Sequence, residues 1–170
     1  MMRRRGGGTL FRRYLVVFLL LVGGVLMAAG ATELRAQFMA GAGSDSTPAY
    51  RTFVMGGRGT LPGEPFRAYG GTRMALARVE WRFDVPAPAL SLGSYASTGH
   101  TMTLAPFLAA GWTGRPPPGM PWTGTDGIRP VAGVAAELFM RIIRVEAGVA
   151  LRGGGMGVTV DINRDWWGIL

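Results

Sequence analysis

The sequence predicts an all-β fold: a partial antiparallel transmembrane β-barrel of about five or six strands after an N-terminal helical signal peptide. Three observations lead to this prediction. Several segments alternate apolar and polar residues with the period of two that is typical of strands. An apolar run with a basic head precedes them, and aromatic residues stand near the ends of the predicted strands.

The composition limits the classes of function. The chain has 170 residues, of which 48% are hydrophobic and 16% are charged; it contains no Cys, and its one His is His100. Disulfides, thiolate metal sites and multi-histidine sites are therefore excluded, and we predict no cofactor. The net charge is +8, but five of the arginines lie in residues 1–13. Because these arginines form a terminal cluster and not a basic face, nucleic acid is not a predicted partner.

Residues 1–36 are predicted to be a signal peptide. A basic head in residues 1–13 is followed by an uncharged, mostly apolar run in residues 14–31 and then by small residues. Cleavage after Ala31 and cleavage near Ala36 both fit, and an uncleaved N-terminal anchor is the alternative. Residues 37–49 are predicted to be a flexible linker, and residues 50–170 the barrel segment.

The clearest strand is predicted over residues 77–84, where apolar residues alternate with charged ones. A strand places the two sets on opposite faces, whereas a helix would mix them. Residues 132–140 and 143–152 alternate with opposite parity, which predicts a hairpin turn at residues 141–143. A further strand is predicted at residues 158–163, and weaker candidates are residues 50–55, 66–69 and 101–112. Residues 85–90 and 115–127, rich in Pro and Gly, are predicted connections.

A sandwich in water and a barrel in a membrane both produce this alternation. The export signal and the aromatic residues favour the barrel, whose apolar face contacts lipid and whose charged face lines the lumen. The predicted lumen-facing charged residues are Arg78, Glu80, Arg82, Glu137, Arg144, Glu146, Arg152 and Asp161. The predicted aromatic girdle consists of Trp81, Phe83, Trp112, Trp166 and Trp167.

The number of strands is small for a barrel. The residues after position 36 provide about six spans, whereas a closed single-chain barrel needs about eight strands. We therefore expect that copies of the chain assemble together or that the chain is the C-terminal portion of a larger barrel.

Part of the sequence is similar to a known family. Residues 56–83 combine a Gly-rich loop with a strand that ends in Glu80-Trp81-Arg82, and residues 106–112 and 129–152 continue with a further strand and a hairpin. These features resemble the last five or six strands of the sixteen-stranded barrel of the BamA/TamA-type bacterial surface antigen family, the eighty-five-kilodalton outer-membrane-protein superfamily. The resemblance implies a structural role, or a role in outer-membrane protein assembly or translocation.

The resemblance also indicates a loop motif, formed by Arg58, Gly59, Gly63 and Arg67. The family's loop has an Arg-Gly-aromatic core, but here Pro62 stands in place of the Arg and Glu64 in place of the aromatic residue. Arg58 and Arg67 are the candidates to supply the missing charge inside the lumen. The last residue is Leu170, where the family usually has an aromatic residue.

The expected protein is an outer-membrane β-barrel protein or fragment in the cell outer membrane. Its expected partners are outer-membrane lipid and either other barrel strands or copies of itself. The alternative is a small exported β-sandwich or oligomeric barrel that binds lipid or a surface partner. An enzyme is not predicted, because His100 and the nearby Ser94 and Ser97 lack the nucleophile elbow of a serine hydrolase.

Overall fold

The structure, a computed structural model, describes residues 32–44 and 51–162, except 90, 92, 95, 96, 98 and 154. The predicted all-β, antiparallel fold is confirmed for this part of the chain. No helix among these residues has the length and hydropathy that a membrane-crossing helix requires. The strands are β1 (Thr32–Ala42), β2 (Phe53–Met55), β3 (Tyr69–Gly71), β4 (Arg73–Pro86), β5 (Thr101–Thr113), β6 (Arg129–Leu138), β7 (Ile143–Ala150) and β8 (Met156–Ile162).

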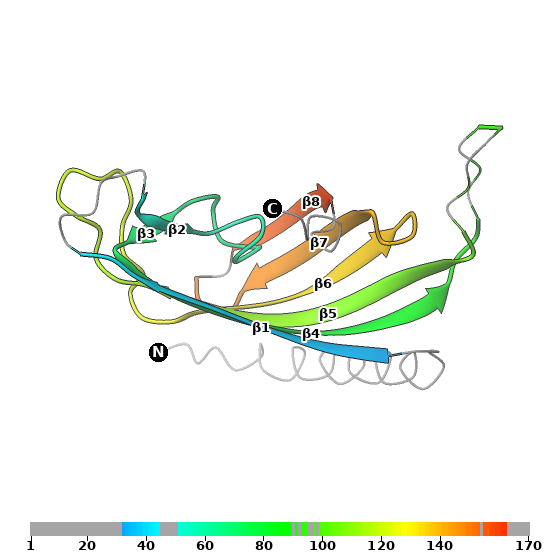
Figure 1. Cartoon of the computed structure of the whole chain (residues 1–170), viewed down its shortest axis with the longest axis horizontal. Helices are drawn as coiled ribbons and strands as arrows, with labels where there is room; N and C mark the ends of the chain where they lie inside the picture. The colour runs from blue at the N-terminus through cyan, green and yellow to red at the C-terminus, as the bar shows by residue number, and fades with distance from the viewer. Residues whose placement is uncertain are drawn as a thin grey trace, which may run out of the picture.

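Six of the strands form one open, curved sheet. Its order is β1-β4-β5-β6-β7-β8, and every neighbouring pair is antiparallel. Strands β2 and β3 form a separate small hairpin, which lies with its connecting loop over the inner side of the curve (Figure 1). Within the described residues β1 pairs only with β4 and β8 only with β7, so both are edge strands.

Strand β1 corrects the prediction of a leader and linker in this region. Residues 32–42 are not a linker: they pair with β4 along their whole length. The reason is that this segment also alternates, with Leu34 and Phe38 on one face and Glu33 and Arg35 on the other. Cleavage near Ala36 would cut β1, whereas cleavage after Ala31 would leave it whole. The rest of the predicted signal peptide, residues 1–31, lies outside the described residues.

The two faces of the sheet differ sharply in chemistry. We call the face that carries Arg78 and Glu80 of β4 the inner face, and the face that carries Val79 and Trp81 the outer face. Apart from the strand ends, the outer face is apolar from β1 to β8. Its most exposed side chains include Leu34, Phe38, Leu108, Val158 and Val160.

The strands are staggered along the sheet. One row of facing residues runs from Arg35 in the first half of β1 through Phe107 to Gly157 near the start of β8. Because β1 and β8 run in opposite directions, β1 extends mainly to one side of this row and β8 to the other. A stagger of this kind accompanies the strand tilt of barrels.

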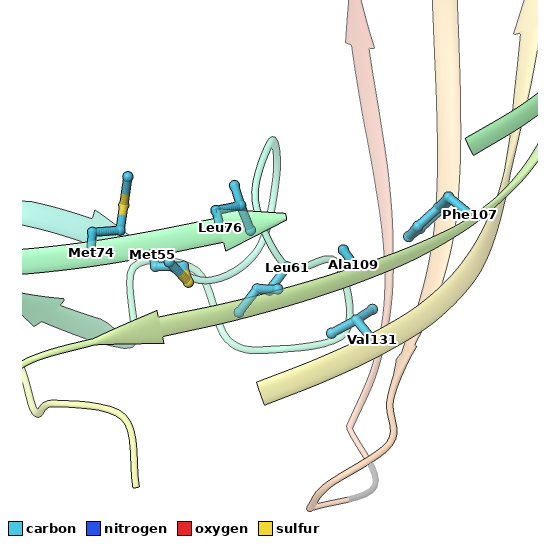
Figure 2. Packing of buried hydrophobic residues seen from close by; sticks show 7 residues of the cluster. All are labelled: Met55, Leu61, Met74, Leu76, Phe107, Ala109 and Val131. Carbon is cyan, nitrogen blue, oxygen red and sulfur yellow. The ribbon is translucent and has the colours of Figure 1, made fainter. Parts of the chain in front are cut away.

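An apolar core covers the half of the inner face that lies under the loop between β2 and β3. Leu61 and Met55 come from this loop and hairpin, and they pack against side chains of β4, β5 and β6 (Figure 2). Gly111 in β5 provides the space, since a methyl group there would overlap the Met55 sulfur. The cluster consists of Met55, Leu61, Met74, Leu76, Phe107, Ala109 and Val131.

Leu61→Ala is expected to lower the free energy of unfolding by about 2–5 kcal/mol, because it leaves a cavity at a side chain that is 0% exposed. Urea titration in detergent micelles measures this change. Leu108→Ala is the matched control: it removes the same atoms from the outer face, where Leu108 is 63% exposed, and should cost less than about 0.5 kcal/mol. Equal losses in the two variants would contradict the placement of Leu61 in the core.

Candidate functional site

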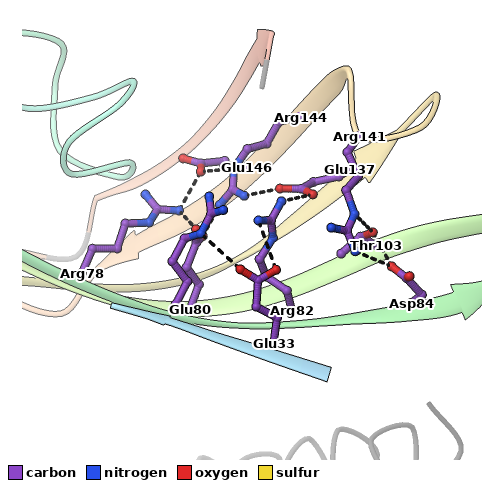
Figure 3. A network of polar contacts seen from close by, with 11 residues as sticks. Glu33, Arg78, Glu80, Arg82, Asp84, Thr103, Glu137, Arg141, Arg144 and Glu146 are labelled. Atoms are coloured by element: carbon purple, nitrogen blue, oxygen red, sulfur yellow. Dashed lines mark hydrogen bonds and ion pairs between the residues drawn. The ribbon is translucent and has the colours of Figure 1, made fainter. Parts of the chain in front are cut away.

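The other half of the inner face holds a buried network of ion pairs (Figure 3). It joins three arginines and three glutamates from β4, β6 and β7, so its formal charges cancel. All six side chains are at most about one tenth exposed. The members are Arg78, Glu80, Arg82, Glu137, Arg144 and Glu146.

Arg144 of β7 is the centre of the network. Its Nη1 lies 2.6 Å from Oε1 of Glu137, and its Nε lies 2.6 Å from Oε1 of Glu146. Its Nη2 donates to Glu80 across the sheet. One guanidinium group therefore bonds to three carboxylates, which uses the planar fork of donors that Arg provides.

Two further arginines complete the network from β4. Arg78 Nη2 lies 2.6 Å from Glu146 Oε1, and its guanidinium carbon stands 4.0 Å from the centre of the Phe107 ring. Arg82 Nη2 lies 2.5 Å from Glu137 Oε2, and its Nη1 lies 3.6 Å from Glu33 of β1. The network thus connects an edge strand to the middle of the sheet.

Small residues make room for these contacts. Side chains of β4 contact those of β7 across the two strands between them, β5 and β6. This contact requires that the sheet curve and that the inner-face residues of β5 and β6 beneath the network be small. Ala105 of β5 faces Ala135 of β6, and both are fully buried. Larger side chains at these two positions would fill the space that the arginines and glutamates occupy.

A second polar cluster lies at the end of the sheet near the turn between β6 and β7. Thr103 donates a 2.5 Å hydrogen bond to Asp84, and Arg141 of the turn donates to the Thr103 hydroxyl at 3.1 Å and lies 3.3 Å from Asp84. The turn residues Phe139, Met140 and Arg141 have positive φ values of 55°, 56° and 69°. This turn occupies residues 139–142, which overlaps the predicted 141–143 but begins two residues earlier, and it points Arg141 back to the inner face.

The loop between β2 and β3 docks on β7 and β8. Arg58 forms a two-bond ion pair with Asp161 of β8, with Nε 2.8 Å from Oδ2. Gly63, with φ 105°, lies against the backbone of Gly148 and Gly157. A methyl group at Gly148 would overlap the carbonyl oxygen of Pro62. Glycines therefore form the surface of β7 and β8 on which the loop docks, because a side chain there would overlap the loop backbone.

Glu64 is a second polar anchor of the loop between β2 and β3. Its Oε2 accepts a 2.9 Å hydrogen bond from the Tyr69 hydroxyl, and its Oε1 lies 3.9 Å from Nη1 of Arg129. Burial, together with this hydrogen bond, raises the pKa of Tyr69, so the hydroxyl remains a donor. Tyr69 and Arg129 thus hold the loop tip at the start of β6.

The structure brings seven of the eight predicted inward charges to the inner face. The six network members meet one another, and Asp161 meets Arg58. Arg152 is the exception: it lies in the turn after β7, where it pairs with the exposed Asp126 at 3.2 Å. Of the two candidate loop arginines, Arg58 reaches an inward acid, whereas Arg67 remains exposed near the Phe66 ring.

The predicted aromatic girdle requires correction. Trp112 lies near the end of β5 and is exposed. Trp81 is exposed but lies well inside β4, because pairing with β5 continues to Pro86. Phe83 has the outer-face register of Val79 and Trp81, but it is only 3% exposed. Trp166 and Trp167 lie outside the described residues.

Two parts of the site are missing from the sequence prediction. One is Glu33 on β1, whose strand the leader interpretation conceals. The other is the pair Gly148 and Gly157, which face each other on β7 and β8 and lie against Pro62 and Gly63 of the loop. Glycine at polar-face positions of neighbouring strands is the signal that indicates such a docking surface.

Gly59 lies in the docked loop with φ 81° and lines a polar cavity of about 90 Å³ next to the network.

Within residues 32–44 and the described part of 51–162, no three metal-ligating side chains gather in one place. Comparisons with protein-family models, curated proteins and solved structures found no match.

Arg144→Met is expected to destabilise the fold by about 3–5 kcal/mol, because three buried carboxylates lose a shared partner. Chemical unfolding in micelles measures the loss. Arg152→Met makes the same change in an exposed pair and should cost at most about 1 kcal/mol. A loss in Arg144→Met no larger than in this control would refute a structural role of the network.

Gly148→Ala is expected to displace the loop and to speed trypsin cleavage at Arg58 and Arg67. An increase of about tenfold corresponds to about 1.4 kcal/mol of lost docking free energy. Time courses of limited proteolysis, followed by mass spectrometry, provide the measurement. Gly114→Ala is the control, because a methyl group there meets its nearest neighbour at an ordinary 3.5 Å. Unchanged cleavage in Gly148→Ala would show that docking of the loop does not depend on a glycine at this position.

Proposed function

We propose that this chain is an outer-membrane β-barrel segment with a structural or outer-membrane-assembly role. The observation that carries the proposal is the outer face of the six-stranded sheet, which is apolar and exposed while the inner face is charged and buried. Leu34 is 73% exposed and Phe38 71% exposed. Lipid is the solvent in which such a face is stable.

The alternative of a sandwich in water places the apolar face against a core. Here the small β2–β3 hairpin lies over the inner face instead, and the outer face has no second sheet among the described residues. Soluble monomers rarely expose contiguous apolar patches larger than a few hundred Å². The distribution of polar and apolar residues therefore favours the membrane over the sandwich.

Other observations support the same proposal. The stagger of the strands suits a barrel wall, and the order of motifs in residues 56–152 resembles the surface antigen family. The docked loop and the ion pairs fill much of the inner face, which favours a structural or assembly role over a wide pore. The proposal assigns no catalytic role and requires no cofactor.

Val134→Lys tests the proposal. This residue lies on the outer face in the middle of β6, where a charge facing lipid costs about 2–4 kcal/mol. We expect the variant to be depleted from the outer-membrane fraction and to lose heat-modifiable gel mobility. Thr159→Lys is the control, because it places the same charge on the inner face beside Asp161 and should integrate normally. Recovery of the unaltered chain as a soluble monomer after export would overturn the proposal.

A further inference from the structure

One end of the sheet carries positive charge that no described acid neutralises. We call it the loop end; there β1, β5 and β7 finish and β4, β6 and β8 begin. The described acids of this end, Glu64 and Asp126, lie 3.9 and 3.2 Å from the guanidinium groups of other arginines. Arg73 at the start of β4 and Arg115 after β5 are both exposed, and neither pairs with a described carboxylate.

Arg73 and Arg115 lie on neighbouring strands, with an indole ring beside them. The carbonyl of Arg73 accepts a 2.9 Å hydrogen bond from the N–H of Gly114, the residue before Arg115. A methyl group at Gly114 would stand 3.5 Å from Cβ of Arg73 and 3.8 Å from Cη2 of Trp112. Because paired strands are about 5 Å apart, both flexible guanidinium groups can reach one oxyanion next to the ring.

We propose that Arg73, Trp112 and Arg115 form a binding site for the phosphate of an anionic phospholipid at the membrane surface. This inference rests on the proposed function, because only a chain whose outer face lies in lipid brings headgroups to this level of the sheet. The guanidinium groups bind the phosphate oxygens through charge-assisted hydrogen bonds, and the indole ring lies between the headgroup and the acyl chains.

The place of the site along the sheet fits a headgroup. From Ala75 to Val85, every outer-face residue of β4 is apolar, and Arg73 is the charged residue with which this face begins. Trp112 faces Ala75 from the last outward position of β5. A Trp at the boundary of an apolar face is typical of a membrane interface, where phosphate groups replace acyl chains as neighbours.

The connection after β5 holds the backbone of Arg115 in place. The N–H of Thr113 donates to the Thr125 hydroxyl at 2.9 Å, and the N–H of Thr125 donates to the Thr113 hydroxyl at 3.0 Å. The N–H of Gly70 in β3 donates to the Thr123 carbonyl at 3.0 Å. Three prolines follow Arg115, and a residue before proline is restricted to extended backbone. Binding therefore costs little backbone ordering at this position.

The charge of the site indicates which phospholipid it prefers. A zwitterionic phospholipid carries an ammonium group beside its phosphate, and two uncompensated guanidinium groups repel that ammonium group. An anionic phospholipid has no such group, and clusters of arginine at a membrane surface attract it. We therefore expect a preference for the anionic headgroup.

Native mass spectrometry of the full-length protein in an uncharged detergent tests the inference. The probes are phosphatidylglycerol and phosphatidylcholine with identical acyl chains. We expect one phosphatidylglycerol to bind more tightly than phosphatidylcholine, and Arg73→Gln and Arg115→Gln each to weaken phosphatidylglycerol binding about fivefold. Arg67→Gln is the matched control: it removes another exposed arginine, which contacts the Phe66 ring, and should leave binding unchanged.

Three results would overturn the inference. These are equal binding of the two lipids, equal losses in Arg73→Gln and Arg67→Gln, and displacement of the lipid by inorganic phosphate at the same concentration, which would indicate a site for a free anion. In each case heat-modifiable mobility and recovery in the outer-membrane fraction would leave the proposed function standing. A chain recovered as a soluble monomer after export would remove both proposals.

Discussion

The structure depends on the neutralisation of charge on the inner face of the sheet. Arg82 and Glu137 are buried so deeply that either charge alone would cost several kcal/mol. Three arginines and three glutamates avoid this cost by bonding to one another. Because strand residues alternate between faces, placing all of these side chains on the inner face leaves the outer face to apolar residues. The buried ion pairs and the exposed apolar surface are thus two results of one pattern.

Space is the second requirement, and small residues meet it. Ala105 and Ala135 form the floor beneath the ion pairs, while Gly148 and Gly157 admit the backbone of the loop. The loop then covers the remaining inner face with Leu61 and Met55. Two polar contacts hold the loop: Arg58 pairs with Asp161, and Glu64 accepts a hydrogen bond from Tyr69. Charged side chains and glycines together therefore hold the loop on the inner face.

Local patterns predict the strands better than they predict the contacts of the site. Alternation in residues 77–84 and 143–150 depends only on neighbouring residues, and it places Glu80 and Arg144 on the inner face. The pairing of these two side chains depends on the curvature of the sheet, which no local pattern contains. In β1, the small residues near Ala36 favour a cleavage site and conceal an alternation that Glu33 and Arg35 share with β4. Phe83 shows a different limit of local patterns: its position in the alternation predicts an exposed side chain, but the side chain is buried.

The inner face of the sheet is filled, whereas β1 and β8 each pair with only one strand among the described residues. This contrast defines what any further strand beside β1 or β8 would contribute. The inner face already neutralises its buried charges, and the loop already covers its apolar half, so a partner contributes mainly backbone hydrogen bonds and continuity of the apolar surface. Both contributions come from strands of the same alternating type as β1 and β8.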